Sequence, residues 1–159
     1  MAIKFGKAFG ARVALFTHSK HKVDDAVALG ADEVVLSSNE SAMKEKHGTL
    51  DFILDTISAN HDLTTYVNPL KRDGVMTVVG IPENPQALAL GSLISPRKIL
   101  AGSLIGGIKE TQEMLDFCAE NNVLCDIETI KLEGINEAYD RMLKSDVKYR
   151  FFIDMKKSF

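Results

Sequence analysis

Two kinds of apolar pattern alternate along the first half of the chain, and this alternation most constrains the fold. Short runs of β-forming residues occupy 12–17, 33–36, 50–56 and 75–80, and between them apolar residues recur every three to four positions. The run at 75–80 is almost continuously apolar, which is typical of a parallel strand covered on both faces. Strands that alternate with helices predict a doubly wound α/β layer with right-handed crossovers.

The helices expected between these strands differ in how clearly they are marked. Helical spacing is clear at 2–9, 24–29 and 63–70 and weak in the polar stretch 37–48. Gly10 and Gly30 are suitable residues to end the first two helices. The pair Asp73-Gly74 predicts a turn before the strand at 75–80.

The pattern changes after Pro82. A proline-containing loop leads to an apolar stretch at 88–93 and a β-rich segment at 99–105, and Gly106-Gly107 marks a boundary. Beyond it we expect helices at 110–120 and 135–142 and strands at 127–132 and 149–153. The sequence therefore predicts an α/β layer over residues 1–107 and a smaller α+β tail over 108–159.

Composition excludes several classes of protein. The chain has 159 residues, of which 45% are hydrophobic, and a formal net charge of −3, which argues against a dedicated nucleic-acid binder. No apolar run approaches the roughly 18 residues of a membrane span, and the first residues lack the layout of a signal peptide. Two cysteines are too few for a disulfide framework. We therefore expect a cytoplasmic protein with no nucleic-acid or membrane partner.

The segment 17–22 is the most informative candidate site, because ligands of doubly wound sheets bind at the carboxyl ends of strands. It reads Thr-His-Ser-Lys-His-Lys, and the first acidic residue after it is Asp24. In dinucleotide folds an acid here selects a ribose 2′-hydroxyl, whereas hydroxyls and cations accept a 2′-phosphate. The alternative is a solvated turn with its lysines on the surface.

Other motifs favour structural roles. His18 and His21 have no third metal ligand at suitable spacing. Cys118 shares a helical stripe with Met114, which indicates core packing rather than a nucleophile. The glycines at 102–107 lack the Lys-Ser/Thr ending of a phosphate loop, so they indicate a tight connection.

Several blocks, taken in order, resemble zinc-dependent medium-chain alcohol dehydrogenases, and most closely the NADP-preferring cinnamyl-alcohol dehydrogenase branch. The blocks are 29–34 (LGADEV), 70–74 (LKRDG), 79–80 (VG), 102–107 (GSLIGG), 110–117 (ETQEMLDF) and 148–151 (KYRF). The resemblance covers essentially the whole chain. It implies a Rossmann-type parallel sheet followed by a C-terminal segment that packs on the catalytic domain.

The resemblance also implies that this chain corresponds to the C-terminal half of such an enzyme. The family's first strand and glycine-rich turn would lie before Met1, so we expect a sheet without its first strand. The catalytic domain and its zinc ligands would lie there too, and neither cysteine of this chain matches a zinc ligand of the family. We therefore expect no catalytic residue and no metal ligand here, and zinc only in the complete enzyme.

A set of cofactor-binding residues follows from the resemblance, position by position. The residues expected at the 2′-phosphate of NADP are Thr17, His18, Ser19 and Lys22. His18 departs from the family pattern, in which a stronger cation is common. Those expected along the rest of the cofactor are Thr56 and Ile57 (adenosine), Val79, Gly80 and Ile81 (nicotinamide ribose), Ser103, Leu104 and Ile105 (carboxamide), and Arg150 (pyrophosphate).

The function implied is the cofactor-binding portion of an NADP(H)-dependent alcohol dehydrogenase or aldehyde reductase, which transfers hydride between a small primary alcohol or aldehyde and NADP. We expect the chain alone to be inactive. A sheet without its first strand exposes strand edges that pair readily with another chain, so we expect a homo-oligomer, such as a dimer. The alternatives are a non-catalytic nucleotide-binding or assembly module, or a truncated remnant.

Overall fold

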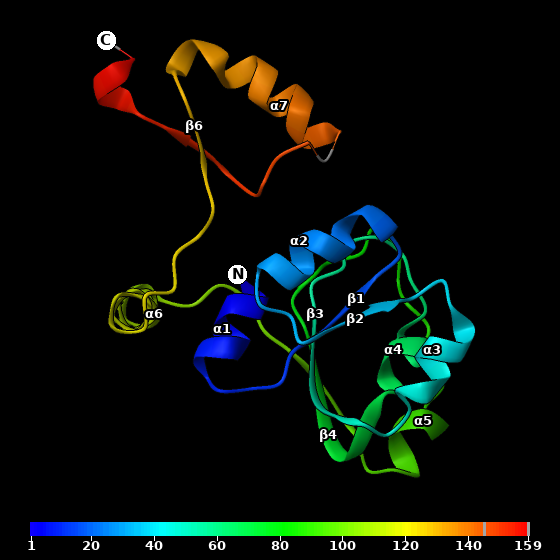
Figure 1. Ribbon diagram of the computed structural model, residues 1–159. Coiled ribbons are helices and arrows are strands. Elements are labelled where there is room, and N and C mark those ends of the chain that lie inside the picture. The colour runs from blue at the N-terminus through cyan, green and yellow to red at the C-terminus, as the bar shows by residue number, and fades with distance from the viewer. Residues whose placement is uncertain (145, 159) are drawn as a thin grey trace. The chain divides into compact units, whose positions relative to one another are not determined.

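The computed structural model describes residues 1–144 and 146–158. Its chain divides into two compact units, one formed by Ala2–Glu113 and the other by Met114–Phe159 with Met1. Figure 1 labels helices and strands of both units. No helix in the described ranges is both long and apolar enough to cross a membrane.

The first unit has the predicted alternation of strands and helices. Its strands are β1 (Ala14–Thr17), β2 (Glu33–Leu36), β3 (Leu50–Asp55), β4 (Leu70–Val78) and β5 (Ile99–Gly102). Its helices are α1 (Ala2–Ala8), the 3₁₀ turn η1 (Lys20–Lys22), α2 (Val23–Ala28), α3 (Glu40–Glu45), α4 (Leu63–Val67) and α5 (Gly91–Ile94). Figure 1 shows α4 beside α5, and the two are in contact. The α/β class is confirmed.

All strand pairs of this unit are parallel, but they form two separate sheets. The hydrogen-bonded orders are β1-β2 and β3-β4-β5. A doubly wound sheet of order 3-2-1-4-5-6 would place its first strand between β1 and β3. Among residues 1–144 and 146–158 no strand joins those two edges. The break in the sheet therefore falls where the resemblance places the first strand.

Each sheet has its own apolar core. Ile3, Ala26 and Ala31 are buried against β1 and β2, whereas the cluster Leu63, Val67, Leu70 and Met76 lies against β3 and β4. In the second cluster Val67 and Met76 are fully buried and Leu70 is 1% exposed. Complete burial of such side chains contributes about 1.5–3 kcal/mol each. The two sheets therefore depend on separate clusters for most of their packing.

An aromatic contact links the two sheets. The ring of Phe16 in β1 meets the ring of Tyr66 in α4 edge to face, with centroids 6.2 Å apart. Tyr66 itself packs against the cluster around Val67. Such pairs stabilise by about 0.5–1.5 kcal/mol beyond the area they bury. Phe16 thereby joins the carboxyl end of β1 to the core of the other sheet.

An ion pair connects α1 to the residue that precedes β2 in the first sheet. Lys7 Nζ lies 2.8 Å from both carboxylate oxygens of Asp32, and the Val13 N–H donates to Asp32 Oδ2 over 2.7 Å. The hydrogen bond from Lys7, followed by that from Val13, lowers the pKa of Asp32 below its ordinary value. The position of α1 beside β1 and β2 is thus fixed by a charge as well as by Ile3.

The turn predicted at Asp73-Gly74 is the main correction to the expected elements. The expected helix at 63–70 ends at Val67, because Pro69 has no N–H with which to continue it. β4 therefore begins at Leu70 and runs through Asp73-Gly74 as one irregular strand. Asp73 has a φ of 61°, and the β3–β4 register shifts beside it, as at a bulge.

Other predicted boundaries shift by a few residues. The strand expected at 12–17 begins at Ala14, and the β-rich segment 99–105 is a strand only to Gly102. The apolar stretch 88–93 includes the start of the helical turn α5, at Gly91. As a result, residues 103–105 lie in a loop directly after β5 instead of within the sheet.

The second unit contains a parallel strand pair with a helix between its strands in sequence. Its elements are β6 (Glu128–Ile130), the 3₁₀ turn η2 (Leu132–Gly134), α7 (Ile135–Leu143), β7 (Phe151–Ile153) and the 3₁₀ turn η3 (Met155–Lys157). Arg141 of α7 bonds Glu128 over 2.8 Å and stands over the Phe151 ring. The helix α6 (Ile108–Glu120) spans both units. The functional division into 1–107 and 108–159 stays a prediction.

Candidate nucleotide-binding site

The carboxyl ends of the strands are aligned within each sheet of the first unit. Thr17 at the end of β1 is paired with Leu36 of β2, while Asp55, Val78 and Gly102 end β3, β4 and β5 in one register. The predicted cofactor-binding residues of this unit are Thr17 itself and residues in the loops that follow β1, β3, β4 and β5. Ligands bind at such ends in doubly wound sheets.

The loop after β1 offers groups for an anion. Thr17 Oγ1 accepts a hydrogen bond from the Ser19 N–H over 3.2 Å. The Ser19 side chain accepts no capping hydrogen bond from η1. His18 and Lys22 are exposed. Neither Lys20 nor Lys22 forms an ion pair in the described part of the chain. Hydroxyl and ammonium donors of this kind suit a phosphate.

The ends of β3 and β4 approach each other very closely. A Cβ built on Gly80 would lie 2.3 Å from the carbonyl oxygen of Ile57. The Val79 N–H also donates to the Asp55 carbonyl over 2.9 Å. Thr56 is exposed and Ile57 is half-buried. These contacts hold the predicted adenosine and ribose walls against each other, and only glycine fits at position 80.

The loop after β5 is apolar and open. Its Ser103 N–H donates to the Val78 carbonyl over 3.2 Å, which continues the sheet pairing by one residue. Leu104 is 81% exposed and Ile105 is 92% exposed. Ile81, after β4, is also exposed. Exposed apolar groups gathered at strand ends are typical of a surface that contacts a ligand or another part of a protein.

Arg150 belongs to the second unit and is described apart from the other predicted residues. It immediately precedes β7, it is exposed, and its carbonyl accepts a hydrogen bond from the Glu128 N–H over 2.9 Å. Its predicted contact with the cofactor pyrophosphate stays a prediction.

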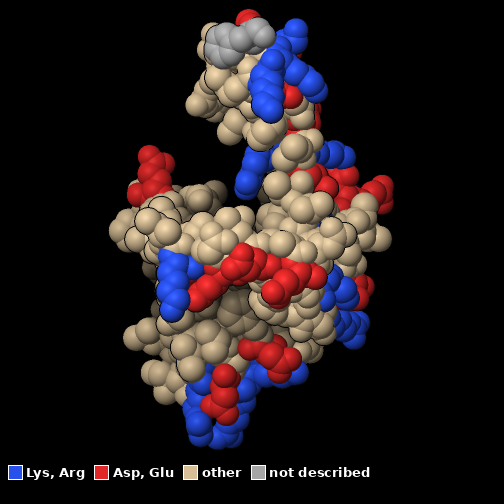
Figure 2. Space-filling view, turned by 90° about the vertical axis from the view of Figure 1, so that its left-hand side faces the viewer, with Lys and Arg blue, Asp and Glu red and all other residues tan. Residues whose placement is uncertain are grey.

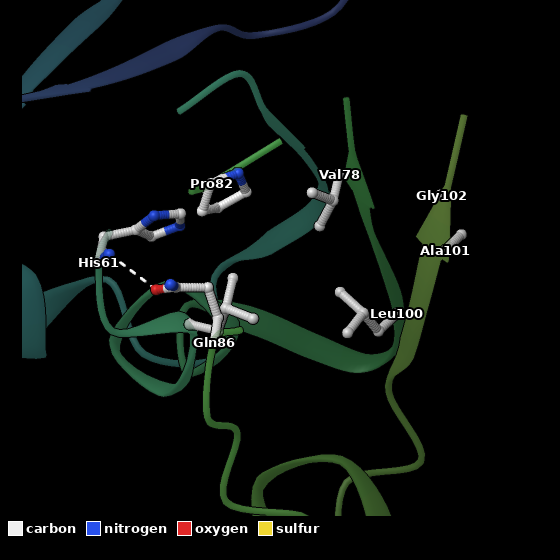
Figure 3. A pocket seen from close by; sticks show the side chains of 8 residues that line it. His61, Val78, Pro82, Gln86, Leu100, Ala101 and Gly102 are labelled. Carbon is white, nitrogen blue, oxygen red and sulfur yellow. Dashed lines mark hydrogen bonds between the residues drawn. The ribbon is translucent and has the colours of Figure 1, made fainter. Parts of the chain in front are cut away.

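A cavity of about 420 Å³ lies beside the site and is drawn in Figure 3. His61, Pro82 and Gln86 form one side of it, and Val78, Leu100 and Ala101 lie opposite. None of the predicted cofactor-binding residues lines it. The polar atoms of Gln86 are already bonded to the His61 N–H, Asn60 and Asn84. The cavity therefore presents mainly apolar surface.

Sequence reasoning did not single out the buried pair beside this cavity. His61 Nε2 lies 2.9 Å from Asp55 Oδ2, and these side chains are 10% and 3% exposed. The one signal in the sequence for this pair is that Asp55 is an acid at the end of an apolar run. A charge at the end of a buried strand requires a partner. The identity of that partner depends on how the loop folds back.

Charged side chains are mixed on the surface. On the face shown in Figure 2, acidic and basic groups lie next to one another without a continuous basic strip. Within the first unit, ion pairs such as Lys71–Asp51 and Arg97–Asp73 join groups of opposite charge. This face therefore carries both signs of charge.

A profile of zinc-binding dehydrogenases matches residues 1–120. This chain belongs to the zinc-binding dehydrogenase family. Aldehyde reductase YahK of Escherichia coli is 54% identical over 155 residues, which cover 97% of this dehydrogenase chain and 44% of YahK.

Two solved structures extend the comparison. A cinnamyl alcohol dehydrogenase from Sorghum bicolor superposes with a TM-score of 0.94 at 41% identity, over all of this dehydrogenase chain and 45% of that one. A cinnamyl alcohol dehydrogenase from Helicobacter pylori, complexed with NADP(H), gives 0.85 at 38% identity, again over 100% and 45%. The chain thus spans less than half the length of these relatives.

Metal ligands are not grouped in this zinc-binding dehydrogenase chain. No three His, Cys, Asp or Glu side chains converge on a common point within residues 1–144 and 146–158. Cys118 is buried and contacts Met114, and Cys125 is exposed. The residues described do not fit a zinc ion.

Proposed function

We propose that this chain is the nucleotide-binding portion of an NADP(H)-dependent alcohol dehydrogenase or aldehyde reductase. In the complete enzyme NADPH would supply the hydride that, with a proton, converts an aldehyde to a primary alcohol, and in the reverse direction the alcohol would return hydride to NADP⁺. The residues of this chain bind and orient the cofactor. Zinc and the substrate-activating groups belong to the other part of the enzyme, and this chain alone does not turn over substrate.

The loop after β1 carries this proposal. Ser19 and Lys22 offer a hydroxyl and an ammonium that forms no ion pair with the described residues, just beyond the end of a parallel strand, and the first acid follows only at Asp24. A 2′-phosphate requires such donors, whereas a free 2′-hydroxyl is usually held by an acid. The Helicobacter pylori relative, which is complexed with NADP(H), supports the same choice. Thr56, Val79 and Ser103 extend the proposed site along the neighbouring strand ends.

The proposal is tested by titrating the chain with NADPH, and in parallel with NADH, while nicotinamide fluorescence is recorded. We expect saturable binding of NADPH and about ten-fold or more weaker binding of NADH, because the 2′-phosphate adds charge-assisted hydrogen bonds. Equal binding of both cofactors contradicts the NADP preference. No binding of either shows that the nucleotide site requires residues outside this chain.

A second candidate is a non-catalytic nucleotide-binding or assembly module. The observation that favours it is the absence of grouped metal ligands in the described ranges. Mixing this chain with a separately produced N-terminal half of a relative distinguishes the two. Aldehyde-dependent NADPH oxidation by the mixture supports the enzyme, whereas binding without turnover supports the module.

We also propose that the chain forms homo-oligomers. Among the described residues β1 pairs with β2 alone and β3 pairs with β4 alone, so each sheet has an unpaired edge at the break in the strand order. Open edges of parallel strands pair readily with another chain. Sedimentation velocity at several concentrations is expected to show a dimer or a larger species. A monomer at all concentrations contradicts this proposal.

A further inference from the structure

The segment between β3 and α4 is tied at both ends to one buried carboxylate. Asp55, the last residue of β3, is 5% exposed and is the buried charged residue of the described chain. Its Oδ1 accepts the Ile57 N–H over 2.9 Å, and its Oδ2 lies 2.9 Å from His61 Nε2. The residues between these two contacts therefore form a closed loop.

The main-chain N–H and both ring nitrogens of His61 make polar contacts. Its ring Nδ1 lies 2.9 Å from the Ala59 carbonyl oxygen. Its main-chain N–H donates to Gln86 Oε1 over 2.9 Å, which is the bond drawn in Figure 3. Both ring nitrogens thus lie within hydrogen-bond distance of an oxygen. The next residue, Asp62, caps α4 by accepting the Thr64 N–H over 3.0 Å. The side chain therefore has little freedom to leave Asp55.

The closed loop between Asp55 and His61 also lies against Gly80. The carbonyl of Ile57 occupies the space that a side chain at position 80 would need. The Asp55 carbonyl accepts the Val79 N–H over 2.9 Å, which joins the loop to the end of β4. Any movement of Ile57 consequently alters the path of both strand ends.

The contacts continue to the first sheet. The His61 ring meets the Tyr66 ring edge to face at 5.5 Å, and Tyr66 meets Phe16 in the same manner at 6.2 Å. Phe16 directly precedes Thr17, where the loop proposed for the 2′-phosphate begins. A chain of direct contacts thus runs from Asp55 to the end of β1, across sheets that share no ladder.

We propose that His61 is a positioning residue of the nucleotide site, which acts through Asp55 to hold Thr56 and Ile57 against Gly80 and through Tyr66 to align the end of β1. This inference rests on the proposed function for its effect on affinity. The closure of the loop stands independently of it.

The test compares His61→Phe with wild type in the full chain. Phenylalanine keeps a ring against Tyr66 but removes both ring hydrogen bonds. We expect NADPH to bind about ten-fold more weakly, the effect of losing one hydrogen bond to a charged group. We also expect amide hydrogen exchange, measured by NMR, to become at least about ten-fold faster at Ile57 and Val79 and unchanged at Val35 in β2.

Two further variants separate positioning from general stability. His61→Gln retains a side-chain N–H that can reach Asp55, so it is expected to restore most of the affinity and the slow exchange. His47→Ala, at an exposed histidine after α3, is expected to change neither. If His61→Phe does not fold, Gln86→Ala replaces it, because it frees the His61 main chain, and a smaller change of the same sign is expected.

The outcomes are distinguishable. The inference is overturned if amide exchange at Ile57 is unchanged in His61→Phe. It is also overturned if exchange becomes faster at Val35 as well as at Ile57 and His61→Gln does not restore the slow exchange. If the wild-type chain binds no NADPH, the proposed function fails for this chain, and exchange at Ile57 alone decides whether His61 closes the loop.

Discussion

Replacing Gly80 with alanine is expected to weaken NADPH binding about ten-fold or more and to lower the free energy of unfolding by about 1–3 kcal/mol. The new Cβ would lie 2.3 Å from the carbonyl oxygen of Ile57 and 2.6 Å from its carbon. Both are backbone atoms, so no flexible side chain can yield. The segment after β3 must therefore move, and the proposed adenosine wall moves with it.

Gly102 provides the matched control for this change. It lies at the carboxyl end of the neighbouring strand, and a Cβ built there has nothing within 4 Å. Gly102→Ala is expected to leave the free energy of unfolding, measured in urea, within about 0.5 kcal/mol of wild type. NADPH titration of both variants completes the comparison. An effect of equal size at both glycines contradicts the role assigned to the close approach at Gly80.

Much of the first unit can be predicted from its sequence because its strands are local and buried. The runs at 33–36 and 50–56 match β2 and β3 within one residue, since their apolar residues are bounded by polar or glycine-containing segments. Parallel pairing also follows, because a helix separates each strand from the next. Because parallel strands have their carboxyl ends at the same edge of a sheet, the loops predicted to bind the cofactor then lie at one edge.

Asp73-Gly74 shows where local patterns are insufficient. An Asp-Gly pair favours a turn, and Asp73 does adopt a positive φ of 61°. The bend nevertheless lies within β4, because Leu70 pairs with Leu50 before it and Val75 pairs with Phe52 after it. Whether such a pair ends a strand or makes a bulge depends on a partner about twenty residues away.

The Asp55–His61 contact was not predictable for a related reason. His61 lies six residues after Asp55 in a loop without periodicity, and no spacing rule states where a loop side chain points. The contact depends on Gln86, which binds the His61 main chain from 25 residues away. Burial of the carboxylate could be suspected from sequence, but the choice of partner is a tertiary effect.

Replacing Ser19 with aspartate is expected to reverse the cofactor preference of the proposed site. NADPH binding is expected to weaken by about 10- to 100-fold, since a hydrogen bond to a charged group contributes about 1.5–3 kcal/mol. The new carboxylate repels a 2′-phosphate but accepts a hydrogen bond from a 2′-hydroxyl. It can also pair with Lys22, which forms no ion pair with the described residues and would no longer be available to the phosphate.

Ser38→Asp adds the same charge after the neighbouring strand β2, on an exposed residue, and so controls for long-range repulsion. At about 0.15 M salt, screening is expected to keep its effect on NADPH binding below about two-fold. The measured quantity is the ratio of the NADPH and NADH dissociation constants from fluorescence titration. The Ser19 N–H already bonds Thr17 Oγ1, so the loop can keep its shape in both variants. A ratio that Ser19→Asp leaves unchanged, or that Ser38→Asp changes equally, removes the loop after β1 from the site and leaves Gly80 and its neighbours to carry the nucleotide assignment.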